Sequence, residues 1–280
     1  MRLLRYGSPG EERPGMLDDQ GVIRALSPVV RDIDEMILSM EGLRFLEALT
    51  PSKLPAVPKP DRFGPPLKRF REIIAVGLNY KEHAQESGVA FPREPVIFAK
   101  SLSSVCGPDD DIVLPPGSTK TDWEIELGVV IGTSASRVSP ERALDHVAGY
   151  CLTNDVSERY WQLERGGQFG KGKSFDTFTP VGPWLVTASS LPDPHNVALH
   201  LDVNGKAMQR GTTRNMIFGV DVLVSYISTY MTLQPGDLIV TGTPAGVGNA
   251  MTPPRYLKNG DIITMTADAL GSQSHRVVGG

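Results

Sequence analysis

Prolines constrain the fold of this chain most strongly in one short region. Six of them, from Pro51 to Pro66, fall within sixteen residues. Each proline fixes φ and removes a backbone donor, so this density excludes regular secondary structure and favours an extended connection. We therefore predict two parts: a small N-terminal α/β domain at residues 1–70, which includes this connection, and a larger domain at residues 71–280.

The wider distribution of glycine and proline predicts short strands. The 280 residues include 29 Gly and 23 Pro along the whole chain, which is typical of many turns and few long helices. A further helix is expected to begin after Asn79, which can cap it, and to end at Gly88. Strands are predicted at 3–6, 15–24 (a hairpin), 73–77, 95–99, 111–114, 122–132, 147–154, 183–187, 197–204, 237–241 and 261–267, and helices within 29–48 and at 157–165 and 219–230.

Composition excludes several classes of protein. The formal net charge is −4, and the sequence has no stripe of Lys and Arg, so we expect no nucleic-acid partner. The two cysteines form no C-x-x-C motif, which argues against a disulfide scaffold or a thiolate zinc site and is compatible with a reducing cytosol. With no apolar run near the roughly 18 residues of a membrane span and no signal-peptide core, a cytoplasmic protein without a membrane partner is expected.

Two carboxylates alternate along the segment from Asp122 to Gly132. In a strand, Glu124 and Glu126 would share one face while the apolar residues between them take the other. Asp155, at the end of a second apolar run, is a third candidate. Buried carboxylates repel one another and lose hydration, and a divalent cation can hold them ionised. Three oxygen ligands suit Mg²⁺ or Mn²⁺ better than zinc. The alternative is an ordinary strand with its Glu side chains in water.

Residues 167–174 match the phosphate-loop pattern G-x-x-x-x-G-K-[ST]. That loop requires an apolar strand before it and a helix after it. Here a polar helical segment precedes the loop, and Pro180 and Pro183 exclude a long helix after it. Nucleotide binding is therefore disfavoured. Lys173 lies in a Gly-rich stretch that follows the carboxylates in the sequence, and the residues alone favour a solvated loop lysine.

One histidine has a candidate partner on its own helix. His83 lies three residues before Glu86, so the two side chains would share a helix face. A carboxylate beside an imidazole orients it and raises its basicity, as a general base requires. The alternative is an ordinary exposed helix pair. The other histidines, His146, His195, His200 and His275, have no evident partner in the sequence and are interpreted as structural or surface residues.

Several of these motifs together resemble the fumarylacetoacetate hydrolase family. They are Gly77-Leu-Asn-Tyr with His83 and Glu86, Glu124-Ile-Glu, Asp155 with Arg159 and Gln162, Lys173-Ser-Phe-Asp-Thr-Phe-Thr-Pro, and Asp237-Leu-Ile-Val-Thr-Gly-Thr-Pro-Ala-Gly-Val-Gly. The resemblance covers about residues 70–280 in order. It implies an α+β fold, a mixed β-sandwich roll that usually forms homodimers, with one Mg²⁺ or Mn²⁺ per subunit.

The resemblance also assigns roles to residues of this sequence. It implies metal ligation by Glu124, Glu126 and Asp155, and catalysis by His83, Glu86 and Lys173. Substrate binding is implied for Arg159 and Gln162, and for the loop of Thr241, Gly242 and Thr243. With three carboxylates, one divalent ion and one lysine in balance, Arg159 is expected to offset the carboxylate of the substrate.

The activity that the resemblance implies is a carbon–carbon bond hydrolase that acts on ketonic substances. Its substrate would be a 2-oxo acid of the 2,4-diketo (acylpyruvate) type, cleaved between C3 and C4 to pyruvate and a second acid. The stretch at residues 100–115 is similar to bacterial hydrolases of 2,4-diketo-3-deoxy-L-rhamnonate or L-fuconate, which would release a hydroxy acid such as lactate. Alternatives on the same scaffold are an oxaloacetate-type decarboxylase or isomerase and a ureidoglycolate lyase.

Overall fold

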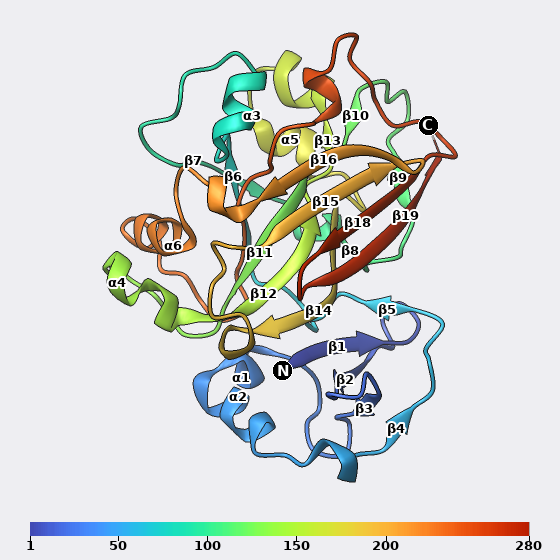
Figure 1. Ribbon diagram of the computed structural model, residues 1–280, viewed down its shortest axis with the longest axis vertical. Coiled ribbons are helices and arrows are strands. Elements are labelled where there is room, and N and C mark those ends of the chain that lie inside the picture. Colours follow the sequence, from blue (N-terminus) through green and yellow to red (C-terminus); the bar gives the residue numbers. More distant parts are fainter. Residues whose placement is uncertain (280) are drawn as a thin grey trace.

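The structure is a computed structural model that describes residues 1–279, and its strands form three sheets. The largest sheet has the order β4-β3-β2-β1-β14-β12-β11-β17-β6-β7, with β5 paired to β1 and β8 paired to β14. A second sheet has the order β16-β15-β18-β19-β9, and β10 pairs with β13. In Figure 1 strands β15, β16, β18 and β19 of the second sheet, in orange and red, lie beside the central strands of the first. This arrangement confirms the predicted α+β fold class.

The strands of the largest sheet are β1 (Arg2–Tyr6), β2 (Arg13–Leu17), β3 (Ile23–Ala25), β4 (Ala56–Val57), β5 (Phe63–Gly64), β6 (Ile73–Gly77), β7 (Val96–Lys100), β8 (Val105–Cys106), β11 (Ile125–Ile131), β12 (Val147–Asn154), β14 (Thr179–Thr187) and β17 (Leu238–Val240). Those of the smaller sheets are β9 (Ile112–Leu114), β10 (Thr121–Asp122), β13 (Ser157–Glu158), β15 (Ala198–Val203), β16 (Lys206–Thr212), β18 (Ile262–Ala267) and β19 (Gly271–Gly279).

The helices are short. The α-helices are α1 (Glu35–Leu38), α2 (Met40–Glu47), α3 (Lys81–Glu86), α4 (Pro140–Ala143), α5 (Phe169–Lys173) and α6 (Val220–Ser228). A π-helix, η4, spans Tyr160–Glu164, and 3-10 turns are η1 (Pro51–Lys53), η2 (Leu102–Ser104), η3 (Leu144–His146), η5 (Ala188–Ser190), η6 (Thr213–Asn215) and η7 (Gly248–Ala250). Among the described residues, no helix combines the length and the apolar character that crossing a membrane requires.

The central strands β11 and β12 are buried over their whole lengths. The odd-numbered side chains of β11, such as Leu127 and Val129, belong to a core shared with Leu199 and Met265 of the second sheet. Val130 points to the other face of β11 and joins a separate core cluster. Because both faces pack against apolar side chains, polar and apolar residues do not alternate in this strand after Glu126.

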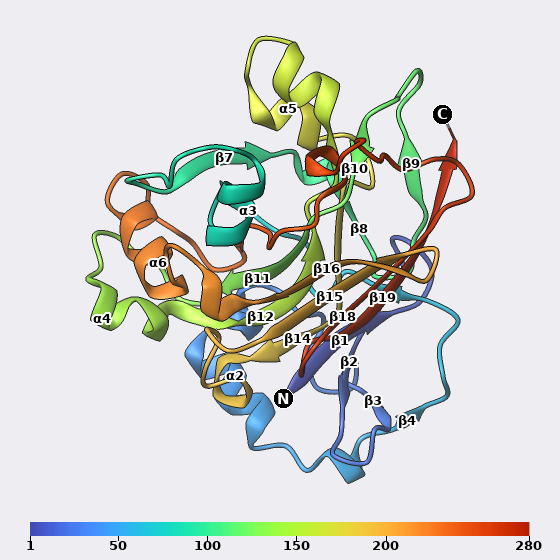
Figure 2. The same cartoon turned by 45° about the horizontal axis from the view of Figure 1, so that its top comes forward.

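The N-terminal residues extend the largest sheet. Strand β1 pairs antiparallel with β14, with Leu3 opposite Leu185. Helices α1 and α2 bury Leu38 and Leu46 in the second core cluster, which also contains Leu238. Figure 2 shows these blue elements below the central strands. The same sheet and one core cluster therefore join residues 1–70 to the rest of the chain.

Several predicted elements differ from the structure. The segment 157–165 is not one helix, because Ser157–Glu158 is a strand that pairs with β10 and only Tyr160–Glu164 is helical. Strands β16 and β19 were not predicted. In β19 buried and exposed positions alternate, but the buried positions include Gln273 and His275. The sequence therefore does not show the alternation of apolar and polar residues that predicts a strand. The proline-rich segment was expected to have no regular secondary structure, but it contains η1 and the two-residue strands β4 and β5. Proline is tolerated at the first position of a helical turn, and neither short strand contains a proline.

The helix after Asn79 begins differently from the prediction. Its N-cap is Tyr80, and no side-chain cap bond is present there. The Asn79 amide instead donates to the carbonyls of Thr241 (2.8 Å) and Phe218 (3.0 Å), which lie more than 130 residues away along the chain. A tertiary contact has replaced the local cap. The predicted end is confirmed, since Gly88 follows the C-cap with φ of +67°.

Candidate metal centre and active site

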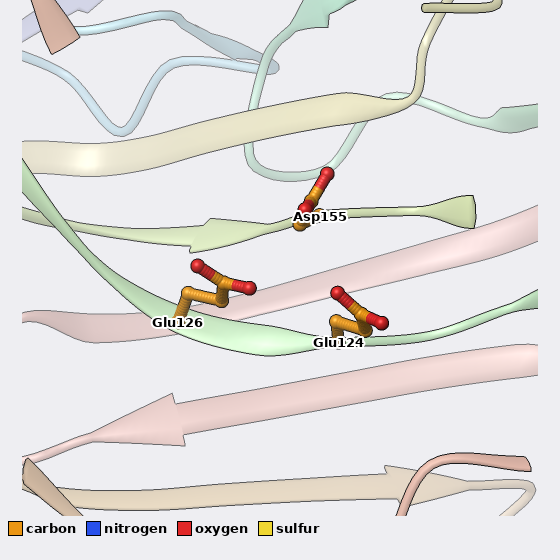
Figure 3. A group of neighbouring side chains, drawn as sticks. All are labelled: Glu124, Glu126 and Asp155. Atoms are coloured by element: carbon orange, nitrogen blue, oxygen red, sulfur yellow. The ribbon is translucent and has the colours of Figure 1, made fainter. Parts of the chain in front are cut away.

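Three carboxylates meet where β11 and β12 lie side by side. Glu124 and Glu126 share one face of the same chain segment, as the alternation predicts, and Asp155 follows directly after β12 (Figure 3). The backbone N–H of Asp155 donates to the Glu124 carbonyl at 2.8 Å. One oxygen of each carboxylate lies within 4.8 Å of the others, and all three residues are buried. The antiparallel register therefore assembles the predicted cluster.

Lysine and arginine side chains contact two of these carboxylates. Lys173 Nζ lies 2.7 Å from Glu124 Oε2 and 2.5 Å from Asp155 Oδ2. Lys100 Nζ contacts the other Asp155 oxygen and donates to the Phe178 carbonyl at 2.8 Å. Lys100 ends strand β7 and is fully buried, but its sequence position gave no sign of this role. The solvated-loop alternative for Lys173 is wrong, because its side chain lies in the buried cluster.

Glu126 differs from its two neighbours. Along residues 1–279 its carboxylate forms no ion pair and accepts one bond, from the backbone N–H of Gly242. Burial, Asp155 and Glu124 together raise the pKa of Glu126 well above its usual range. Burial would also raise the pKa of Glu124, but Lys173 and Arg159 outweigh it and lower that pKa to about 2. The cluster thus contains one carboxylate that lacks a cation.

A hard divalent cation fits this donor set. Three carboxylates supply oxygen ligands, which Mg²⁺ and Mn²⁺ prefer over the nitrogen and sulfur ligands typical of zinc. A cation here would stabilise the ionised form of Glu126, which the described protein groups leave unpaired. Glu124, Glu126 and Asp155 are therefore the residues that would hold it.

His83 and Glu86 form a pair on helix α3. His83 Nδ1 lies 2.7 Å from Glu86 Oε1, and the other Glu86 oxygen accepts a bond from Gly246 N at 2.9 Å. The His83 residue is buried (8% exposed), so the alternative of an ordinary exposed pair does not describe it. The carboxylate fixes the ring and assigns the proton to Nδ1, which leaves Nε2 as a base.

Arg159 is held by an acidic residue that sequence reasoning missed. Its Nε and Nη2 donate to Asp122 Oδ2 at 2.9 and 2.7 Å, and Nη2 also lies 2.7 Å from Glu124 Oε1. Its Nη1 donates to Gln162 Oε1 at 2.9 Å. Two carboxylates therefore already contact the Arg159 guanidinium, which also lines the cavity. Its role toward the carboxylate of a substrate stays a prediction. Asp122 gave only one signal, its place at the start of the acidic segment.

The loop after β17 supports the centre through its backbone. The hydroxyls of Thr241 and Thr243 donate to the carbonyls of Leu127 and Ile125, each at 2.9 Å. Gly242 has φ of +96°, and a Cβ there would lie 2.8 Å from the Asn79 Cβ, so glycine is required. These bonds aim the Gly242 N–H at Glu126. Of the two threonines, Thr243 lines the adjacent cavity.

A cavity of about 470 Å³ opens beside these groups. His83, Glu86, Glu124, Glu126, Arg159, Gln162, Lys173 and Thr243 line it. Asp155 lies beneath this surface, where Lys100 and Lys173 contact it. The volume is within the range of small-molecule sites. Two of the three metal-ligand candidates, Glu124 and Glu126, thus face the same space as the histidine–glutamate pair.

The phosphate-loop match has a different structure from a nucleotide site. Helix η4 precedes it, residues Phe169–Lys173 form the short helix α5 within it, and the chain then enters β14. No strand–loop–helix unit is present in this described segment, as the prolines predicted. Three of the other histidines do have partners: His275 Nδ1 lies 2.7 Å from the Asp110 carbonyl oxygen, His146 Nδ1 lies 3.3 Å from the Thr133 carbonyl oxygen, and His195 Nε2 accepts from Val220 N. These contacts are structural.

Comparison with known proteins places this chain in a family. Residues 72–278 match the model of the fumarylacetoacetate (FAA) hydrolase C-terminal family. A Burkholderia multivorans protein, provisionally named a hydrolase, is 54% identical over 274 residues, which cover 98% of this chain and 97% of that protein.

Two solved structures of similar fold carry names that state an activity. Maleylpyruvate hydrolase from Sphingobium sp. SYK-6, in complex with manganese(II) ion and pyruvate, has a TM-score of 0.82 and 30% identity, with 100% of both chains covered. The 2-hydroxyhepta-2,4-diene-1,7-dioate isomerase from Mycobacterium marinum has a TM-score of 0.75 and 33% identity, with 100% of this chain and 98% of that chain covered. The chain belongs to the fumarylacetoacetate hydrolase family.

Proposed function

We propose that this protein is a divalent-metal-dependent hydrolase of acylpyruvates. The reaction adds water across the C3–C4 bond of a 2,4-diketo acid, R–CO–CH₂–CO–COO⁻. The hydroxyl joins C4 to give the acid R–COO⁻, C3 receives a proton to give pyruvate, and one proton is released. One observation carries the proposal: two members of a three-carboxylate cluster that fits a divalent cation line the same 470 Å³ cavity as a histidine–glutamate pair.

His83 is the group that takes a proton from water in this proposal. Glu86 holds Nδ1 of the ring, so Nε2 can accept the proton while the carboxylate stabilises the imidazolium that forms. A divalent ion at the three carboxylates would act as a Lewis acid that stabilises negative charge on a 2-oxo acid. Gln162 and Lys173 line the cavity beside this position and would orient the substrate.

The names of two similar structures show that proteins with this fold include both a hydrolase and an isomerase. Maleylpyruvate hydrolase cleaves an acylpyruvate, as its name states, and its structure holds manganese and pyruvate. The isomerase from Mycobacterium marinum supports the alternative of proton transfer without cleavage. The His83–Glu86 pair provides a base that hydrolysis would use on water and isomerisation would use on the substrate. The 54% identical relative that is provisionally named a hydrolase favours hydrolysis. The finer proposal, 2,4-diketo-3-deoxy-L-rhamnonate or L-fuconate as substrate, rests on the resemblance of residues 100–115.

Product analysis tests the proposal directly. Purified protein with Mn²⁺ is incubated with 2,4-diketo acids, and proton NMR follows pyruvate and the second acid. Equimolar release of both is expected, with none after chelation of the metal. Isomerised substrate without pyruvate would establish the isomerase, and CO₂ from oxaloacetate without diketo-acid cleavage would establish the decarboxylase.

A further inference from the structure

The cavity has an apolar wall in addition to its charged groups. Leu78, Val89, Phe98, Leu163, Phe169 and Val247 line it and are named the apolar wall here. The wall begins at the metal-ligand candidates, because Lys173 Nζ lies 5.3 Å from the centre of the Phe98 ring. Phe98 in turn packs edge-on against Phe169, with 5.6 Å between ring centres. A ligand seated at the carboxylates would therefore extend along apolar side chains.

Two residues of the apolar wall are exposed to solvent, and a bound ligand would cover them. Val89 is 43% exposed and Leu163 is 48% exposed, although both line the cavity. Exposed apolar side chains at the edge of a cavity mark a surface that an apolar ligand covers. Leu78 adds a third observation, since its φ of +56° is unfavourable for a leucine. Such a backbone conformation at a cavity is typical of functional sites.

The permanent cations of the cavity are already paired. Among the described lining residues the permanent cations are Arg159 and Lys173, and both contact carboxylates. The site holds five carboxylates (Glu86, Asp122, Glu124, Glu126 and Asp155) and the three permanent cations Lys100, Arg159 and Lys173. Of these carboxylates, Glu86 contacts His83, and Glu126 forms no ion pair along residues 1–279. One divalent ion would balance this set. The carboxylate head of a 2-oxo acid then makes the site net negative, and a second carboxylate on the tail would lack a cation.

We propose that this site selects acylpyruvates whose acyl tail is uncharged and apolar at its end, and rejects those whose tail carries a second carboxylate. This inference rests on the proposed function of the same site. The tail lies against the apolar wall, where it buries hydrocarbon and needs no partner charge. A lactoyl tail, which is neutral and ends in a methyl group, belongs to the accepted class. Maleyl and succinyl tails, which end in carboxylates, belong to the rejected class.

Two acylpyruvates of matched shape test the tail preference. In 7-methyl-2,4-dioxooctanoate the tail ends in an isopropyl group, and in 2,4-dioxoheptanedioate a carboxylate of similar shape replaces it. With Mn²⁺ we expect kcat/KM to be at least tenfold higher for the isopropyl compound, because the carboxylate would be desolvated without a partner. The compounds 7-methyl-2-oxooctanoate and 2-oxoheptanedioate lack the 4-keto group and cannot be cleaved in this way. Calorimetric titration with each compound measures the same preference as a difference in binding affinity.

A pair of lysine variants locates the tail. In Leu163→Lys an ammonium is added to the apolar wall, and we expect the isopropyl-to-carboxylate ratio of kcat/KM to fall at least threefold. Leu102→Lys is the matched control, since Leu102 is 47% exposed and lies outside the cavity. That control should keep the wild-type ratio, and thermal unfolding checks that both variants fold. Equal ratios in the two variants would remove Leu163 from the tail site and overturn its placement.

The outcomes separate the two proposals. Cleavage of both diketo acids with equal or reversed preference would overturn the tail assignment and leave the proposed function intact. Binding of the two 2-oxo acids with the expected preference, without cleavage of either diketo acid, would overturn the proposed function and leave the tail assignment intact. Neither binding nor cleavage would overturn both.

Discussion

The carboxylate cluster and helix α3 contribute to the same cavity but are built differently. Glu126 lies in the buried strand β11, Glu124 directly precedes that strand, and Asp155 directly follows β12. Lysines that are fully buried or nearly so hold Glu124 and Asp155 in place. His83 and Glu86 sit on a helix of six residues whose start has no side-chain cap bond. The candidate cation site is therefore fixed by the core, whereas the proposed base is carried by a peripheral element. Changes in the first should alter metal binding and stability, and changes in the second should alter turnover alone.

Substitution of Glu126 should have the largest effect. In Glu126→Gln the shape is kept but the one carboxylate without an ion pair is lost. We expect turnover to fall by about a thousandfold or more, since ligation and charge are lost together, and Mn²⁺ affinity to fall by at least tenfold. Steady-state kinetics and calorimetric titration with Mn²⁺ measure the two effects. Unchanged Mn²⁺ affinity would remove Glu126 from the ligand set.

Substitution of His83 should separate the two regions. In His83→Ala we expect kcat to fall about 10²- to 10⁴-fold, the contribution of a general base, while the Kd for Mn²⁺ stays within twofold. His200→Ala is the control, because His200 is an exposed residue of β15. A wild-type kcat in His83→Ala would exclude His83 as the base. A large change in Mn²⁺ affinity would show that α3 and the carboxylates are not independent.

Removal of Lys100 should act on stability and should depend on metal. Lys100→Met leaves Asp155 with Lys173 as its remaining cation. Breaking a buried ion pair costs about 3–5 kcal/mol, and we expect a loss of this order in urea unfolding of metal-free protein. Saturating Mn²⁺ should recover more than half of the loss, because the ion replaces the missing positive charge. The same loss with and without Mn²⁺ would contradict a cation site at Asp155.

The smallest expected effect lies away from the cavity, at Asp237. Burial raises the pKa of this carboxyl to about 6, and its Oδ1 has no partner among the described residues. Because the folded pKa exceeds the ordinary value of 3.8, its stabilising contribution is complete below that value and is lost as pH rises through 6. Wild-type protein should lose about 1–3 kcal/mol of unfolding free energy from this group between pH 4 and 7.5.

A single variant isolates that contribution. Asp237→Asn cannot titrate, so its unfolding free energy should fall less than that of the wild type over the same pH range. Urea unfolding at several pH values measures the difference. Parallel pH profiles for the two proteins would show that Asp237 carries no shifted proton.

The sequence predicted the local parts of this site and missed the distant contacts. Alternation was enough to put Glu124 and Glu126 on one face, because strand period is a local property. Asp155 reaches them only because Ile125 pairs with Asn154 across two antiparallel strands, and the spacing of residues in the sequence does not determine which residues pair. The family resemblance, not the spacing, placed Asp155 beside the two glutamates.

Residues whose roles depend on tertiary contacts were the ones misjudged or overlooked. Lys100 and Asp122 belong to the centre through partners 55 and 37 residues away. Asn79 was expected to cap a helix but instead bonds to Thr241, because a buried carbonyl needs a donor more than a surface helix needs a cap. Strand β19 was missed because its buried face contains Gln273 and His275.

Anomalous diffraction from crystals grown with Mn²⁺ tests the central claim most directly. We expect one strong manganese peak per chain within about 2.0–2.3 Å of an oxygen from each of Glu124, Glu126 and Asp155. The Lys100 and Lys173 side chains should remain beside Asp155 in that structure. A manganese peak elsewhere, with these three carboxylates still paired only to protein groups, would contradict the claim.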